Sequence, residues 1–149
     1  MDIKYYVSLE TARLLKEKGY DELADAAWDG IFEEFKASTF CAFRNSDYPD
    51  DLKLFSAPSK AEAIDWLEQK HGIRIELRMC HCKVKGDPME IKDTDEYAWR
   101  WFYAIFVGDD INPILDEENE SSEFLKLFDS RLEAENAAII RALKEITKK

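Results

Sequence analysis

Residues 73–84, which read IRIELRMCHCKV, decide the fold class of this chain. Apolar side chains alternate with charged ones from Ile73 to Met79, and alternate residues of a β-strand share one face of the sheet. A second run of strand formers follows at residues 97–107, which read YAWRWFYAIFV, after a turn-rich stretch around Gly86. The sequence therefore predicts an antiparallel hairpin of strands 73–84 and 97–107.

Three helices are predicted around this hairpin, over residues 9–18, 60–71 and 131–147. Ser8 can cap the first helix, and Gly19 ends it. Ser59 and Ser130 each begin an S-x-x-E capping box, in which the hydroxyl and the glutamate each accept a hydrogen bond from an unpaired backbone N–H. We therefore expect an α+β fold, with an antiparallel sheet covered by these helices.

The other stretches have weaker patterns. Residues 21–35 have a helical period interrupted at Asp29 and Gly30, which favours a short helix followed by irregular structure. A short strand that carries Cys41 is predicted over residues 39–44, and a loop with a brief extended piece at 52–55 follows it. Residues 108–129 are acidic and are expected to form a loop.

Length and composition indicate one ordinary globular domain over residues 1–149. The chain has 149 residues, of which 46% are apolar, and at this length roughly 68–70% of the unfolded surface can be buried on folding. No repeat or linker divides it. The first residues lack a secretory signal, and the apolar run 101–107 is far shorter than the roughly 20 residues that span a bilayer. We expect a soluble cytoplasmic protein.

The charge balance argues against nucleic acid and membrane as direct partners. The chain carries 32 acidic and 21 basic residues, a formal net charge of −11. Such a surface repels phosphate backbones and anionic lipid, which are normally met by lysine and arginine stripes. We therefore expect a protein partner or a homo-oligomer.

The adjacent residues Cys80, His81 and Cys82 raise the question of a metal site. In a strand the two thiols lie on one face, about 6.6–6.8 Å apart, and the imidazole lies on the other. Three ligands cannot then converge on one ion with metal–sulfur bonds near 2.3 Å. We expect no metal and no cofactor, and reduced thiols in a chain with three cysteines. The alternative, a metal or redox role, requires further ligands from Cys41 or from a second subunit.

The hairpin carries the candidate binding residues. One side of it must mix large apolar groups with charges, whatever the register of the two strands. Such a side is either covered by a helix or a second subunit, or left open for stacking and cation–π contacts. The candidate residues are Trp99, Trp101, Tyr103, Arg74 and Arg78.

Carboxylate clusters support an alternative. Residues 109–123 contain seven carboxylates and no basic residue, and further clusters lie at 47–51 and 93–96. Together these groups can resemble the charge of a nucleic-acid backbone. The alternative is an acidic DNA mimic that inhibits a host DNA-binding protein.

A resemblance to a known family is carried by a Glu- and Ala-rich C-terminal helix and by five short stretches, Tyr6–Ala12, Lys16–Tyr20, Ala57–Ser59, Trp66–Glu68 and Lys70–Ile73. They resemble a family of small proteins, without an assigned activity, that are encoded in bacteriophages and in prophage regions of anaerobic gut bacteria. The resemblance implies an accessory phage-type gene product. It carries over caps, helix ends and core positions, and no site residue.

Enzyme signatures are scarce. The five glycines are too scattered for a phosphate-binding loop, and neither G-x-S-x-G nor H-E-x-x-H occurs. The leading expectation is a non-enzymatic accessory protein that acts through protein–protein association. A small enzyme that uses a carboxylate pair is a further alternative.

Overall fold

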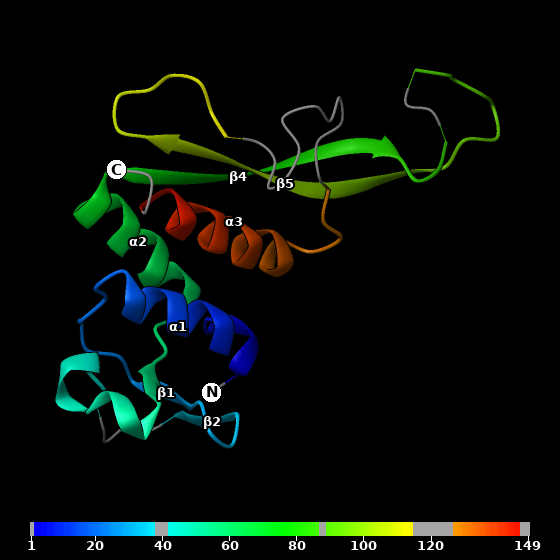
Figure 1. The fold of residues 1–149 in the computed structure, drawn as a ribbon. Coiled ribbons are helices and arrows are strands. Elements are labelled where there is room, and N and C mark those ends of the chain that lie inside the picture. Colours follow the sequence, from blue (N-terminus) through cyan, green and yellow to red (C-terminus); the bar gives the residue numbers. More distant parts are fainter. Residues whose placement is uncertain (1, 38–41, 87–88, 115–126, 147–149) are drawn as a thin grey trace.

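The computed structural model describes residues 2–37, 42–86, 89–114 and 127–146, and it has an α+β fold (Figure 1). The helices are α1 (Leu9–Glu17), α2 (Lys60–His71) and α3 (Arg131–Ile146). The strands are β1 (Ala26–Asp29), β2 (Glu34–Ala37), β3 (Leu54–Ser56), β4 (Ile73–Lys83) and β5 (Tyr97–Val107). The predicted fold class is confirmed, and the helices predicted at 9–18, 60–71 and 131–147 end within a residue or so of those observed.

Local caps explain the three helix starts. The Ser8 hydroxyl accepts a hydrogen bond from the Thr11 N–H at 3.2 Å. At α2 both halves of the capping box are present, from Glu62 N–H to the Ser59 hydroxyl and from Ser59 N–H to the Glu62 carboxylate, each at 3.1 Å. The Ser130 hydroxyl accepts from the Glu133 N–H at 3.2 Å. These contacts satisfy donors that helix geometry leaves unpaired.

The predicted hairpin is present, with β4 and β5 antiparallel. Ile73 pairs with Val107 and Lys83 with Tyr97, so odd-numbered residues of both strands share one face and even-numbered residues share the other. The odd face is mostly apolar, and α3 packs against both strands (Figure 1). Ile73, Tyr103 and Ile105 on this face are at most 1% exposed.

The prediction of a short helix within residues 21–35 is wrong, because β1 and β2 form an antiparallel hairpin there. The Asp29 carboxylate accepts hydrogen bonds from the N–H groups of Ile31 and Phe32, at 2.9 and 3.2 Å, which builds the turn between the strands. A side chain that binds the backbone two and three residues on reverses the chain, whatever the hydrophobic period around it.

A second sheet, with strand order β2-β1-β3, is formed in this part of the chain. The extended piece predicted at 52–55 corresponds to β3. The strand predicted at 39–44 lies largely outside the described residues, although Phe43 forms an isolated bridge with Ala24. In the acidic segment 108–129, Ile114 and Phe128 form isolated bridges with β5, and residues 115–126 lie outside the described residues.

The elements are stacked in layers (Figure 1). The hairpin lies on α3 and α2, α1 lies beyond these helices, and the second sheet lies beyond α1. We expected α1 to cover the hairpin, but it packs between α3 and β3. One hydrophobic cluster runs through the layers, and its fully buried members include Leu15, Leu67, Ile105 and Leu143.

Candidate functional site

The five predicted binding residues lie on two surfaces of the hairpin. Trp99, Trp101 and Tyr103 belong to the odd face, and Tyr103 is only 1% exposed. Arg74 and Arg78 belong to the even face. The structure therefore does not bring the three aromatic residues and the two arginines together.

The even face does mix aromatic and charged groups, but with other aromatic residues than those predicted. Arg74 stacks on the ring of Phe106, with 4.8 Å from the guanidinium carbon to the ring centroid. The Glu76 carboxylate lies between two arginines, 3.6 Å from Arg74 Nε and 2.5 Å from Arg78 Nη2. Both arginine side chains are at least half exposed. Charges thus alternate along the exposed side of β4.

An exposed aromatic cluster occupies the end of the odd face. The β4–β5 hairpin extends past the N-terminal end of α3, so none of the described helices lies beneath the residues at its far end (Figure 1). Trp99, Met79 and Tyr97 are 61, 47 and 45% exposed. The His81 ring lies 4.9 Å from the Trp99 ring and 5.5 Å from the Tyr97 ring, measured between centroids. We call Met79, His81, Tyr97 and Trp99 the aromatic end.

The backbone of β4 presents a second feature beside this cluster. Val84 N–H bonds to the Glu96 carbonyl and Gly108 N–H to the Gly72 carbonyl, both at 2.9 Å. Even-numbered residues of β4 therefore direct their N–H and C=O groups toward β5, and odd-numbered residues direct theirs outward. On β5 the same alternation directs the backbone N–H and C=O groups of Trp101 and Ile105 outward. There they form backbone hydrogen bonds with Phe128 and Ile114, respectively.

The outward groups in the middle of β4 have no such partners in the described part of the chain. No other described residue bonds the outward backbone N–H and C=O groups of Ile75, Leu77, Met79 and His81. We call this stretch the β4 edge. A row of unpaired groups on an edge strand is a template for a further strand.

The thiols lie as the strand pattern predicts. Cys80 and Cys82 are on the even face, and His81 is on the odd face. The Cys82 thiol donates to the Ala98 carbonyl at 3.7 Å, and burial raises the pKa of Cys80, with a further contribution from its hydrogen bond with Cys82. Within the described part of the chain, no three His, Cys, Asp or Glu residues are grouped to hold a metal ion. Cys41 lies outside that part.

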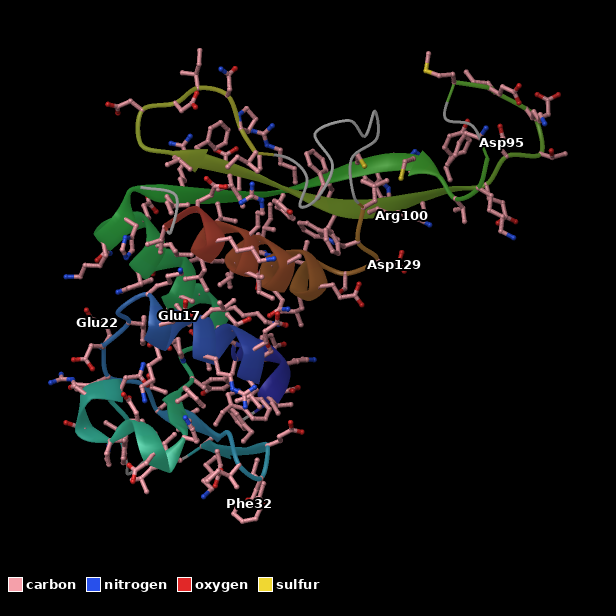
Figure 2. The ribbon with its side chains drawn as sticks, viewed as in Figure 1. Glu17, Glu22, Phe32, Asp95, Arg100 and Asp129 are labelled. Carbon is pink, nitrogen blue, oxygen red and sulfur yellow. The ribbon has the colours of Figure 1, made fainter. Side chains whose placement is uncertain are left out.

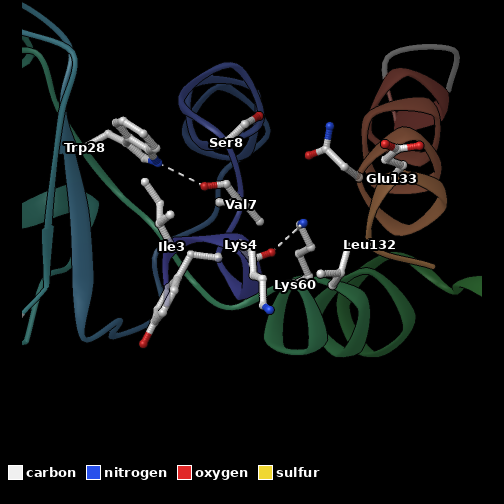
Figure 3. Close-up of a pocket in the computed structure, with 10 residues that line it drawn as sticks. Ile3, Lys4, Val7, Ser8, Trp28, Lys60, Leu132 and Glu133 are labelled. Carbon is white, nitrogen blue, oxygen red and sulfur yellow. Dashed lines mark hydrogen bonds between the residues drawn. The ribbon is translucent and has the colours of Figure 1, made fainter. Parts of the chain in front are cut away.

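A cleft of about 380 Å³ lies between the N-terminal segment, α2 and α3 (Figure 3). Its walls include Ile3, Val7 and Leu132, and Lys60 lies at its base. Lys60 is 8% exposed, and its ammonium group donates to the Lys4 carbonyl at 2.7 Å. Burial lowers the pKa of Lys60. We call this the Lys60 cleft.

Sequence reasoning missed this cleft. Lys60 stands inside the capping box, where a lysine is ordinarily a solvated residue of the first turn. No local pattern marks it, because the groups that bury it come from distant segments of the chain.

The described acidic clusters are far apart. Asp47, Asp50 and Asp51 lie in two short 3₁₀-helices before β3, Asn45–Asp47 and Asp50–Leu52, whereas Asp95 lies in the loop at the far end of the β4–β5 hairpin (Figures 1 and 2). Asp50 and Asp95 are also paired, with Lys16 at 3.3 Å and Lys83 at 3.2 Å. The carboxylates of residues 115–126 lie outside the described residues.

Of the helices in the described ranges, none has the length and apolar character needed to cross a membrane.

Comparisons of this chain with protein-family models, with curated proteins and with solved structures found no match.

Proposed function

We propose that this protein acts through protein–protein association, by addition of a partner strand to the β4 edge. The observation that carries this proposal is the row of outward backbone groups at Ile75, Leu77, Met79 and His81, which have no partner among the described residues. Strand addition draws affinity from main-chain hydrogen bonds and specificity from alternate side chains.

The β4 edge has few of the features that normally protect an edge strand. Protected edges are short, or carry charged side chains, proline, a bulge or an inward-pointing charge. Of these features β4 has the charges of Arg74, Glu76 and Arg78, which alternate in sign. It spans 11 residues and contains no proline, and its only lysine is Lys83 at the last position. The aromatic end adjoins the edge and offers exposed Trp99 and Tyr97, residue types that are enriched at the centres of interfaces.

A second copy of this chain is the partner that the side chains of β4 fit best. An antiparallel pair centred on Leu77 places Glu76 opposite the partner's Arg78, twice by symmetry, and Ile75 opposite the partner's Met79. Opposite charges at facing positions stabilise a strand pair by roughly 0.2–1 kcal/mol each. If the two-fold axis of the strand pair lay at Glu76 or at Arg78 instead, that residue would face its own copy, and like charges would lie opposite each other. The proposed contact is therefore a two-fold β4–β4 pair.

The main test removes one outward N–H and leaves the hairpin intact. In Met79→Pro the lost N–H points away from β5, so the β4–β5 ladder keeps all its bonds. We expect wild type to show a mass that rises toward the dimer with concentration in analytical ultracentrifugation, and Met79→Pro to stay monomeric with an unchanged circular dichroism spectrum. Met79→Ala keeps the N–H and should still associate. Equal association of wild type and Met79→Pro would refute strand addition.

Charge exchange tests the partner. Glu76→Arg alone places arginine opposite the partner's Arg78 and should weaken the dimer, whereas the double variant Glu76→Arg/Arg78→Glu restores opposite charges and should recover it. Recovery is specific to the pair centred on Leu77. If wild type stays monomeric at all concentrations, the second copy is the wrong partner. Strand addition then requires a partner protein whose binding Met79→Pro abolishes.

The aromatic end has a matched control in Phe32. This residue is 73% exposed in the β1–β2 turn and lies far from the β4–β5 hairpin (Figure 2). Trp99→Ala should weaken association by about tenfold or more, as expected for an interface residue that contributes over 1.4 kcal/mol. Phe32→Ala should leave association unchanged. Equal effects of both substitutions would indicate nonspecific hydrophobic contact.

The resemblance to phage-encoded proteins leads us to propose that this association serves an accessory role in a phage or prophage. The DNA-mimic alternative gains no support from the described carboxylates, because the clusters lie far apart and two members are paired with lysines. The described carboxyl groups with shifted pKa values are Asp2, Asp29 and Asp95, and all three values are lowered by backbone N–H donors. A general acid requires a raised value, so nothing in these three groups favours the enzyme alternative.

A further inference from the structure

We propose that the Lys60 cleft binds a small organic carboxylate, whose anionic group contacts the Lys60 ammonium and whose apolar body contacts the cleft walls. This site is separate from the β4 edge and does not depend on the proposed association. The two can therefore be tested independently.

The first observation is a buried cation that has no ion-pair partner among the described residues. Lys60 is 8% exposed, and its one hydrogen bond to a described residue goes to the Lys4 carbonyl. An ammonium has three donors, so two of them remain without a described acceptor. No described carboxylate oxygen lies within ion-pair distance of Lys60. The Glu135 carboxylate raises the pKa of Lys60 electrostatically, although less than burial lowers it, and Glu135 is itself paired with Arg131 at 3.0 Å. Buried lysines are almost always paired, because desolvation of the charge is costly.

Other buried lysines of the same chain show the ordinary arrangement. The side chains of Lys18 and Lys83 are 8 and 7% exposed, and each has a carboxylate nearby, Glu17 at 3.9 Å and Asp95 at 3.2 Å. Lys60 is as deeply buried and lacks this partner. A ligand carboxylate would supply it.

The second observation is the chemistry of the walls. Ile3, Val7 and Leu132 contribute apolar surface, and the cleft volume of about 380 Å³ lies at the lower end of the range for small-molecule sites. The indole N–H of Trp28 is already bonded to the Val7 carbonyl at 2.9 Å, so the Trp28 ring contributes mainly apolar surface.

The remaining polar groups at the cleft favour an acceptor ligand. The side-chain oxygen of Asn136 accepts from the Thr11 hydroxyl at 3.3 Å, which leaves the Asn136 amide N–H groups as donors. Glu133 borders the cleft as an exposed residue and forms no ion pair with Lys60. One ammonium and one amide above apolar walls match a monoanion with an apolar body, whereas a phosphate dianion would leave a second charge unpaired.

The test uses hexanoate as the probe, with hexanol and hexylamine as length-matched controls. We expect hexanoate to raise the melting temperature of wild type in a saturable manner and to shift the NMR signals of Leu132 and Val7, and the controls to do neither. Lys60→Met should weaken hexanoate binding by about tenfold or more, because it removes a charge-assisted hydrogen bond. Leu132→Trp fills the cleft with Lys60 intact and should also abolish binding.

Three results would overturn the proposal. Equal binding of hexanol and hexanoate would show that apolar contact alone fills the cleft, and an equal effect of chloride would show generic anion binding. Without ligand, we expect Lys60→Met to be at least as stable as wild type, since an uncompensated buried charge is removed. A marked loss of stability in Lys60→Met would mean that the role of Lys60 is structural, through its bond to the Lys4 carbonyl, and not to bind a ligand. Both variants retain the β4 edge, so failure here leaves the association proposal standing.

Discussion

Asn45 shows how one buried polar residue joins distant segments of this protein. It is 5% exposed, and its amide N–H donates to the Tyr20 carbonyl at 2.8 Å. Its side-chain oxygen accepts from the Ser56 N–H at 2.9 Å. Asn45 therefore links the end of the α1 segment to β3, using both the donor and the acceptor of its amide side chain.

Asn45→Ala should destabilise the fold by about 2–4 kcal/mol, because it leaves two buried backbone groups unpaired. Asn45→Asp should also be destabilised at neutral pH, since its carboxylate faces the Tyr20 carbonyl, and should recover part of the loss at low pH, where the protonated carboxyl donates. Urea unfolding of both variants beside wild type at pH 7 and pH 4 measures this. A change below about 0.5 kcal/mol in Asn45→Ala would contradict the role.

The turn between β1 and β2 predicts a specific acid sensitivity. The pKa of Asp29 is held below its ordinary value of 3.8, because its carboxylate accepts hydrogen bonds from the N–H groups of Phe32 and Ile31. This contribution to stability is fully present above that ordinary value and is lost as the pH falls through the lowered value. We expect Asp29→Asn to be less stable than wild type at pH 6 and to lose less stability between pH 4 and pH 2.

The measurement is urea unfolding across this pH range. Asp93→Asn is the control, because it removes an exposed carboxylate that accepts no hydrogen bond from a described residue. Parallel pH profiles for Asp29→Asn and wild type would show that the turn does not depend on the ionised carboxylate.

At the level of elements, α2 depends on its capping box. Ser59→Ala removes the acceptor for the Glu62 N–H and should cost about 1 kcal/mol of unfolding free energy. Ser59→Asp keeps an acceptor and places a negative charge at the positive end of the helix dipole, so its stability should stay close to that of wild type. Thermal unfolding separates the two variants, and equal losses would show that the hydroxyl itself, rather than an acceptor, is required.

The length and local signals of each element decided whether it could be predicted from the sequence. The three helices and the long hairpin carry their own signals, such as Ser59 with Glu62 or the alternation that begins at Ile73. The strands β1 and β2 have four residues each, too few to show a period. Their pairing depends on the Asp29 turn and on β3. A side chain at Gly30 would place its Cβ 2.7 Å from the Phe55 ring, so β3 packs closely there only because this residue is glycine.

At the level of the whole molecule, stability should fall along the hairpin. Ile73 and Ile105 are fully buried, whereas Met79 and Trp99 near the other end are 47 and 61% exposed. We expect the inward amides of Cys80 and Cys82 to exchange at least about tenfold faster than those of Arg74 and Glu76, because local opening is easier where little apolar surface is buried. Hydrogen exchange at low protein concentration measures this, and uniform protection would contradict it.

The outward amides give a second readout of the same experiment. Those of Leu77 and Met79 should exchange rapidly in the monomer and become protected as concentration rises, if a second copy adds to β4. Protection that is independent of concentration would mean that these amides are covered within one chain.

By itself the sequence determined the α+β class, the three helices and the two faces of the hairpin, because caps and side-chain periods act between residues a few positions apart. Only the tertiary structure decided that Trp99 and Arg78 lie on opposite faces of the β4–β5 hairpin. It also decided that α3 does not extend beneath the aromatic end, and that the β4 edge lacks a described partner. It further decided that Lys60 lies in a cleft where no described carboxylate forms an ion pair with it. These features depend on strand register and on which distant segments exclude water from a given group, and no local pattern encodes either.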